Sequence, residues 1–125
     1  MANSSDYRLG AIWIVSFDPS VGTEIQKTRP ALIISGSPFN AKRSKVTVLP
    51  FTSAPQNVEQ SRLAPAVVIV RASVENGLTV DSLLVCIEPM TFDKARLTKR
   101  IGFFEAELLQ SAQEILGRYL SLRSI

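Results

Sequence analysis

The side chains available for chemistry in this chain are those of arginine, lysine, threonine, serine, tyrosine and the carboxylates. Its 125 residues include no histidine and one cysteine, Cys86. Histidine is the usual general acid or base at neutral pH and the commonest metal ligand. Its absence excludes a Ser-His-Asp triad, a Cys-His dyad, a histidine-based ribonuclease pair and a zinc site. Catalysis would therefore depend on the remaining groups or on a bound hard metal.

Length and composition indicate one globular domain. Hydrophobic residues make up 46% of the chain and charged residues 20%, which is typical of a folded domain. No apolar run approaches the roughly 20 residues of a membrane helix, and the polar first ten residues do not resemble a secretion signal. One cysteine permits no internal disulfide, so we expect a cytoplasmic protein without a membrane partner. The net charge of +3 permits a nucleic-acid partner.

Short apolar segments separated by turn signals predict a mainly β chain with some α structure. We expect a flexible polar arm over residues 1–9 and a single domain over residues 10–125. Strands are predicted over residues 10–17, 30–35, 46–51, 65–70 and 82–86. Residues 65–70 are apolar on both faces, which favours an interior strand. The basic run at residues 42–45 is typical of a solvated connector, with contact to nucleic acid as the alternative.

One amphipathic helix is predicted near the end of the chain. Apolar side chains recur at helical spacing between residues 105 and 120 and define one face. A single helical turn is expected at residues 93–97, followed by a short extended piece at residues 99–102. Short strands followed by one helix indicate a small β-barrel or bent sheet with a helix packed on it.

A linked set of motifs is more specific than the fold class. In chain order it consists of a D-P-x-x-G-x-E loop at residues 18–24, Arg-Pro at 29–30, Pro-x-Thr at 50–52, Asn-Gly-Leu at 76–78, Asp-Ser at 81–82 and Asp-Lys-Ala-Arg-Leu at 93–97. Their order and spacing resemble the MazF/PemK family of toxin endoribonucleases from bacterial toxin–antitoxin pairs. The resemblance runs from about Gly10 to the final helix. It implies an SH3-like barrel of the CcdB/Kid/MazF type, a homodimer, and sequence-specific cleavage of single-stranded RNA without a metal or other cofactor.

The resemblance assigns catalysis to Arg29 and Thr52. When a ribose 2′-OH attacks its own 3′-phosphate to give a 2′,3′-cyclic phosphate and a 5′-OH, negative charge develops in the transition state. A guanidinium offers several donors to such oxygens, and a threonine hydroxyl can position or donate. Taken alone, Arg29 would more often hold a loop carboxylate, and Thr52 would more often cap a turn. The identity of the general base stays open.

Further RNA contacts are expected around these two residues. Gln26, Lys27 and Thr28 offer donors to phosphates, and Glu24 is expected to orient Arg29. Ser53 can share the role of Thr52. All of these assignments depend on the family resemblance.

This chain departs from the family pattern at residues 87–90. There the family often has Asp-Gln-Ile-Arg, whereas this chain has Ile-Glu-Pro-Met. Glu88 places an acceptor-only carboxylate near a polyanion, which could select a cytosine amino group or weaken cleavage.

The resemblance also implies partners. Family members are inhibited by a small MazE-like or PemI-like antitoxin whose acidic tail covers the RNA groove. The expected partners are therefore single-stranded RNA, such an antitoxin and a second copy of the chain, with the terminal helix and residues 65–70 as candidate dimer seams. The alternatives are an inactive or weakened homologue that only binds antitoxin or RNA, and a CcdB-like toxin that binds DNA gyrase. The RNA sequence that is cut stays open.

Overall fold

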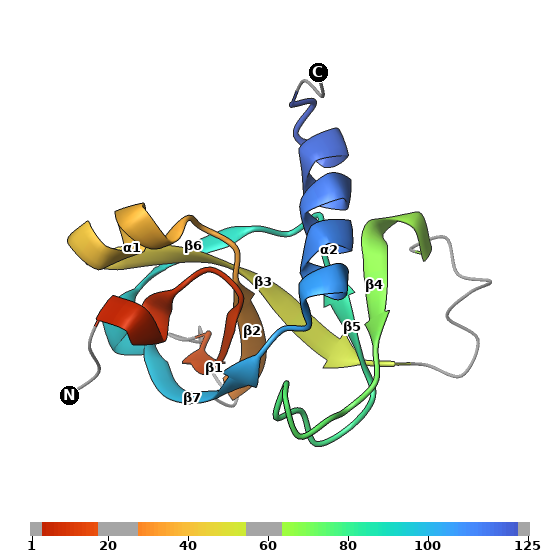
Figure 1. Cartoon of the computed structure of the whole chain (residues 1–125), viewed down its shortest axis with the longest axis horizontal. Coiled ribbons are helices and arrows are strands. Elements are labelled where there is room, and N and C mark those ends of the chain that lie inside the picture. Colours follow the sequence, from red (N-terminus) through yellow and green to blue (C-terminus); the bar gives the residue numbers. More distant parts are fainter. Residues whose placement is uncertain (1–3, 18–27, 55–63, 123–125) are drawn as a thin grey trace, which may run out of the picture.

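The computed structural model describes residues 4–17, 28–54 and 64–122. It contains a bent antiparallel sheet and two α-helices, the second of which packs on the sheet and extends beyond it (Figure 1). The strands are β1 (Ala11–Ser16), β2 (Thr28–Ile33), β3 (Lys45–Ser53), β4 (Val67–Val70), β5 (Ser82–Val85), β6 (Met90–Asp93) and β7 (Leu97–Phe103). The helices are α1 (Ser37–Lys42), α2 (Ala106–Tyr119) and the short 3-10 turns η1 (Ser4–Tyr7), η3 (Ala64–Ala66) and η4 (Lys94–Arg96). The prediction of a mainly β fold with a C-terminal helix is confirmed.

Strand β3 organises the sheet because three other strands pair with it. The sheet order is β4-β5-β3-β2-β1-β7, and β6 also pairs with β3. The first part of β3, Lys45 to Val48, faces β6, whereas its last part, Phe51 to Ser53, faces β5. Strand β2 lies along its other edge. The end of β3 is therefore the place where β2 and β5 approach each other.

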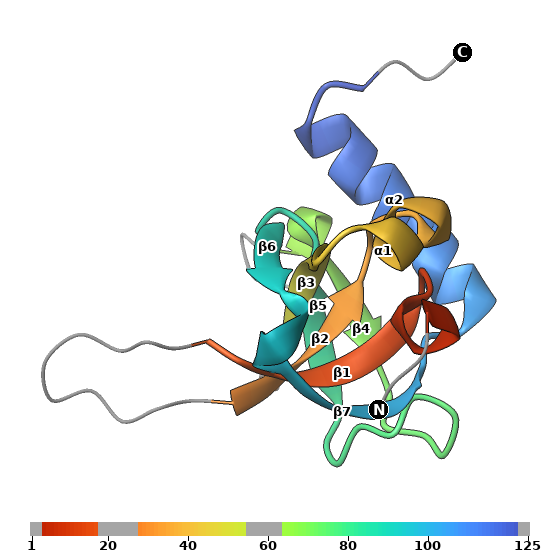
Figure 2. The same cartoon turned by 90° about the vertical axis from the view of Figure 1, so that its left-hand side faces the viewer.

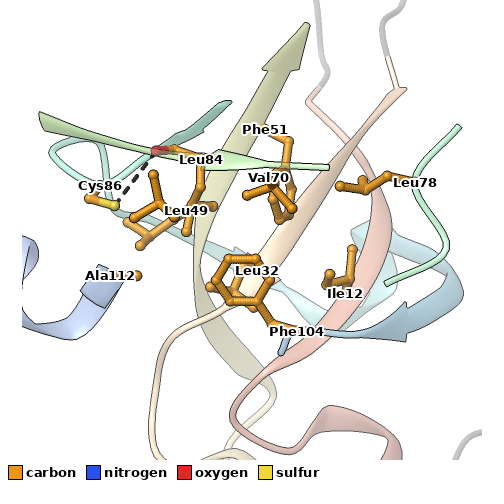
Figure 3. Packing of buried hydrophobic residues seen from close by; sticks show 11 residues of the cluster. Ile12, Leu32, Leu49, Phe51, Val70, Leu78, Leu84, Cys86, Phe104 and Ala112 are labelled. Carbon is orange, nitrogen blue, oxygen red and sulfur yellow. Dashed lines mark hydrogen bonds between the residues drawn. The ribbon is translucent and has the colours of Figure 1, made fainter. Parts of the chain in front are cut away.

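Alternation along the strands divides the apolar side chains between two cores. The first core holds Ile12, Leu32, Leu49, Phe51 and Leu84 among others, and α2 contributes Ala112 to it (Figure 3). The second core lies on the opposite face of β1, β2 and β3 and includes Trp13, Ala31, Ile33 and Val48. Successive strand residues point to opposite faces, so the same strands serve both cores.

Helix α2 covers one side of the first core. Leu108, Leu109 and Ile115 pack on that core, and α2 lies beside β4. Figure 1 shows the helix continuing past the sheet, and Tyr119 and Leu120 at its far end are exposed. None of the helices within the described ranges is long and apolar enough to cross a membrane.

The flexible arm predicted for residues 1–9 is wrong for its described part. The ring of Tyr7 stacks on that of Trp13 at 4.9 Å, and the Trp13 Nε1–H donates to the carbonyl of Asp6 at 2.8 Å. Arg100 forms an ion pair with the Asp6 carboxylate at 3.4 Å. The polar composition of these residues suggested a flexible arm. Instead, the Trp13 ring provides a stacking surface for Tyr7, and its N–H provides a hydrogen bond to Asp6, so this segment is held in place.

Three further predictions are corrected by the packing. Residues 36–45 include helix α1, in which buried Asn40 donates to the Tyr7 carbonyl. Strand β4 lies at the edge of the sheet and not in its interior. It is apolar on both faces because Val68 and Val70 enter the first core while Val67 packs with Leu83 on the other side. Strand β6 follows Pro89, where only the end of a strand was expected.

Candidate active site

Arg29 and Thr52 are brought together by the pairing of β2 with β3. The described ladder joins Ile33 to Val48, Leu32 to Leu49 and Ala31 to Pro50. The ladder ends at this last pair, and Arg29 and Thr52 each lie two residues beyond it on their own strands. Their side chains line the same two pockets. Both residues are exposed at the strand ends.

Two adjoining hollows open at this point, and we name each after a residue of its wall. The Leu78 pocket has a volume of about 340 Å³ and is lined by Arg29, Pro30, Phe51, Thr52, Ser53, Leu78, Thr79, Val80 and Ser82. The Met90 pocket has a volume of about 360 Å³ and is lined by Phe17, Arg29, Pro50, Phe51, Thr52, Val85, Glu88 and Met90. Arg29, Phe51 and Thr52 belong to both walls. A ligand that extends from one pocket into the other would therefore pass a guanidinium and a hydroxyl.

Some of the predicted site residues line the two pockets, one does not, and others lie outside the described residues. Ser53 joins Arg29 and Thr52 in the Leu78 pocket, and Glu88 joins them in the Met90 pocket. Thr28 is exposed at the start of β2 and is absent from the described walls of both pockets. Glu24, Gln26 and Lys27 lie outside the described residues, as does the loop carboxylate with which Arg29 was expected to pair.

The wall formed by Leu78, Thr79 and Val80 was not predicted. It belongs to the segment between β4 and β5, which is held by the buried side chain of Asn76. The Asn76 Oδ1 accepts from the backbone N–H groups of Ser73 and Leu78, each at 3.0 Å. Its Nδ2 donates to the Arg71 carbonyl at 2.9 Å and to the Glu105 carboxylate at 3.2 Å. The segment is thereby attached to the start of α2.

Gly77 fixes the same segment against β7. Its φ is +72°, and a Cβ at this position would lie 1.9 Å from the carbonyl oxygen of Ile101. Only glycine fits such a close approach without moving the backbone. The Asn-Gly turn signal marked the turn in the sequence, but not its role as a support for a pocket wall.

Cys86 takes no part in the site. It is fully buried in the first core, and its Sγ–H donates to the Leu84 carbonyl at 3.6 Å. Burial raises the pKa of the Cys86 thiol to about 11. A protonated, enclosed thiol is inert, as expected for a small buried hydrophobe.

The described residues do not gather into a metal-ligand set. Across residues 4–17, 28–54 and 64–122, no three or more Cys, Asp or Glu side chains are grouped to hold an ion.

Comparisons with known proteins agree with this fold. Endoribonuclease PemK of Escherichia coli is 34% identical over 115 residues, which cover 91% of this chain and 80% of that protein. Endoribonuclease MazF9 of Mycobacterium tuberculosis is 33% identical over 122 residues, which cover 94% of this chain and 98% of that protein. A MazE–MazF structure from Deinococcus radiodurans has the same fold, with a TM-score of 0.75 at 21% identity over 93% of this chain and 96% of that one.

A family model provides the assignment. The model described as "PemK-like, MazF-like toxin of type II toxin-antitoxin system" matches residues 8–120. This range includes both pocket walls and all of α2. The resemblance predicted from the motifs is confirmed, and the chain belongs to the PemK-like, MazF-like toxins of type II toxin–antitoxin systems.

Proposed function

We propose that this toxin is an endoribonuclease that cuts single-stranded RNA at a short sequence without a metal ion. The observation that supports this most directly is that Arg29 and Thr52, on neighbouring strands, line the same two pockets. Two relatives that are a third identical over most of the chain are named endoribonucleases. The proposal thus has two supports: relatives named endoribonucleases, and a guanidinium and a hydroxyl that can both donate hydrogen bonds to a phosphate.

The reaction needs charge stabilisation above all. The ribose 2′-oxygen attacks the adjacent phosphorus, the bond from phosphorus to the 5′-oxygen breaks, and the products are a 2′,3′-cyclic phosphate and a 5′-OH. The 2′-OH proton is lost to a base, and the leaving 5′-oxygen gains a proton. Arg29 would donate to the non-bridging phosphate oxygens as their charge grows, and Thr52 would hold the phosphate in line. Neither side chain is a base at neutral pH.

The remaining predicted site residues would contact the RNA on either side of the phosphate that is cut. Ser53 stands beside Thr52 and would donate to the same phosphate or its neighbour. Glu88 would contact the base that enters the Met90 pocket. Thr28, Gln26 and Lys27 would bind phosphates, and Glu24 would orient Arg29; these four roles are proposed from the family resemblance.

The proposed protein partners are a MazE-like antitoxin and a second copy of the chain, in the cytoplasm. A MazE–MazF complex is among the structures that share this fold. A site built to bind phosphates can also accept an acidic peptide segment, which is how an antitoxin would block it. The exposed apolar side chains of Ile69, Tyr119 and Leu120 are candidates for the dimer seam.

Incubation of the pure protein with a long single-stranded RNA in EDTA tests the function. We expect discrete cuts, 2′,3′-cyclic phosphate ends and a loss of cutting in Arg29→Ala but not in Arg118→Ala, an exposed arginine on α2. Intact RNA in EDTA and in Mg²⁺ alike would contradict an enzymatic role. Tight antitoxin binding would then indicate an inactive homologue, and inhibition of DNA gyrase would indicate a CcdB-like toxin.

A further inference from the structure

Charge is divided unevenly between the two halves of the molecule. The half that contains α1, β6 and β7 faces the viewer in Figure 2. Five of its exposed or half-buried cations, Arg8, Lys45, Lys94, Arg96 and Arg100, are called here the basic face. Two described carboxylates accompany them: Asp6, which pairs with Arg100, and Asp93, which accepts from the Ala95 N–H and caps η4. On the other half, α2 and the segment before β5 carry mostly glutamate and aspartate.

Contacts between neighbouring elements join these cations into one continuous surface. Lys45 lies opposite Asp93 in the β3–β6 pairing, and the Lys94 N–H donates to the Ser44 carbonyl at 2.8 Å. The Lys94 Nζ lies 4.7 Å from the centre of the Tyr7 ring, which stacks on Trp13. Trp13 in turn lies opposite Arg100 in the β1–β7 pairing. The surface thus runs from the start of β3 to the edge strand β7.

Aromatic rings hold several of the cations in place. Arg8 and Arg100 lie over the Phe103 ring, at 3.9 and 4.5 Å from its centre. A ring beneath a guanidinium restricts the side chain but leaves its charge unneutralised. Among the described residues, the pair between Arg100 and Asp6 is the only ion pair. Most of the charge on the basic face is therefore not neutralised by a carboxylate of the described residues.

The basic face begins at the wall of the Met90 pocket. Phe17, which lines that pocket, meets Phe92 edge to face at 5.3 Å. The Arg96 guanidinium lies 5.9 Å from the centre of the Phe92 ring, and its Nη1 donates to the Ser16 carbonyl at 3.4 Å. Ser16 pairs with Thr28, the neighbour of Arg29. A strand leaving the pocket past Phe17 would therefore reach Arg96 first.

We infer that the basic face binds the phosphate backbone of the same RNA strand outside the cut site. This inference depends on the proposed ribonuclease function, because continuity with the Arg29 pocket is what favours RNA over an acidic protein. Lysines and arginines on an open surface contact phosphates without reading bases. The face would therefore increase affinity for long RNA and leave the choice of cut sequence to the two pockets.

The test compares two double variants that each remove two exposed cations. Arg8→Gln/Lys45→Gln alters the basic face, and Arg71→Gln/Arg118→Gln alters the other half. Each is titrated with a 30-nucleotide 2′-O-methyl RNA, which cannot be cut, over a range of salt concentrations. The slope of log affinity against log salt is expected to become shallower by about 1.4 in the first variant only, about 0.7 for each phosphate that a cation no longer neutralises. The KM for a long RNA should rise in that variant, whereas the KM for a hexanucleotide with the same cut site should not.

Equal slopes and equal KM values in the two variants would overturn the inference. So would unchanged RNA binding with lost affinity for poly-L-glutamate, because the face would then fit an acidic protein. Failure of the proposed function would be seen separately, as a hexanucleotide that the unaltered protein leaves intact.

Discussion

Arg29 on β2 and Thr52 on β3 each lie two residues beyond Ala31 and Pro50, the last pair of their ladder, and line the same two pockets. The two side chains are therefore placed by neighbouring strands and not by the path of a loop. Both strands contribute to both cores, so the two groups extend from strands that are anchored in the buried part of the chain. Such preorganisation lowers the cost of aligning a phosphate.

Removing both groups should cost less than the product of the single losses. We expect Arg29→Ala to slow single-turnover RNA cleavage by about 10²–10³-fold, as for other charge-stabilising donors. Thr52→Val should also slow it, and Thr52→Ser should restore part of the rate because it keeps the hydroxyl. If both act on one phosphate, the double variant will be faster than independent effects predict. Strictly multiplicative losses would contradict a shared target.

Glu88→Gln should change which base is accepted beside the cut. A carboxylate only accepts hydrogen bonds, so it favours bases with an exocyclic amino group and disfavours the O4 of uracil. The amide can also donate and should admit uracil. Mapping of cut sites in a random-sequence RNA measures this, with Glu107→Gln, an exposed residue on α2, as the matched control. Identical profiles for all three proteins would remove Glu88 from base selection.

Asn76→Ala should lower the free energy of unfolding by about 2 kcal/mol or more. The substitution leaves the N–H groups of Ser73 and Leu78 without their buried acceptor. Each buried group left unsatisfied costs about 1–3 kcal/mol. Since the Leu78 pocket loses its support, the KM for RNA should also rise. Urea unfolding and cleavage kinetics test both effects. A stability equal to that of Gln110→Ala, which removes an exposed amide on α2, would contradict this role.

The stability gained from Cys86 should decrease in alkali. The pKa of the thiol is 9.0 ordinarily and about 11 in the folded chain because burial disfavours the thiolate. The folded state therefore keeps a proton that the unfolded state loses, and the stabilisation is complete below pH 9 and lost as pH rises through 11. Urea unfolding of the unaltered protein and Cys86→Ala at pH 8, 9.5 and 10.5 should show a shrinking difference. A constant difference would indicate a thiol that ionises alike in both states.

Local pattern was sufficient for most of the elements, whereas the centre of the site was predicted from the family resemblance. The apolar spacing of residues 105–120 predicted α2 to within one residue at each end. Arg-Pro and Pro-x-Thr singled out Arg29 and Thr52 only as members of a linked set of motifs, because each motif alone has a common structural explanation. Their roles in catalysis remain predictions.

Long-range contacts explain what the sequence did not predict. The pocket wall at Leu78 depends on a bond from Asn76 to Glu105, 29 residues away. Residues 4–9 looked like an arm because the tryptophan that holds them lies on another element. Strand β4 was predicted to be interior because it is apolar on both faces. An edge strand covered by a helix has the same pattern, and the sequence alone does not show that α2 covers one face of β4.

The position of Trp13 has a practical consequence. It is the only tryptophan of the chain, it is 5% exposed, and Tyr7 covers its ring. Its emission should therefore be blue-shifted in the native state, and a red shift should report the detachment of η1 separately from unfolding of the sheet. The protein thus contains an intrinsic fluorescent reporter beneath the surface formed by Arg8, Lys94 and Arg100, and no added dye is needed to observe that end of the molecule.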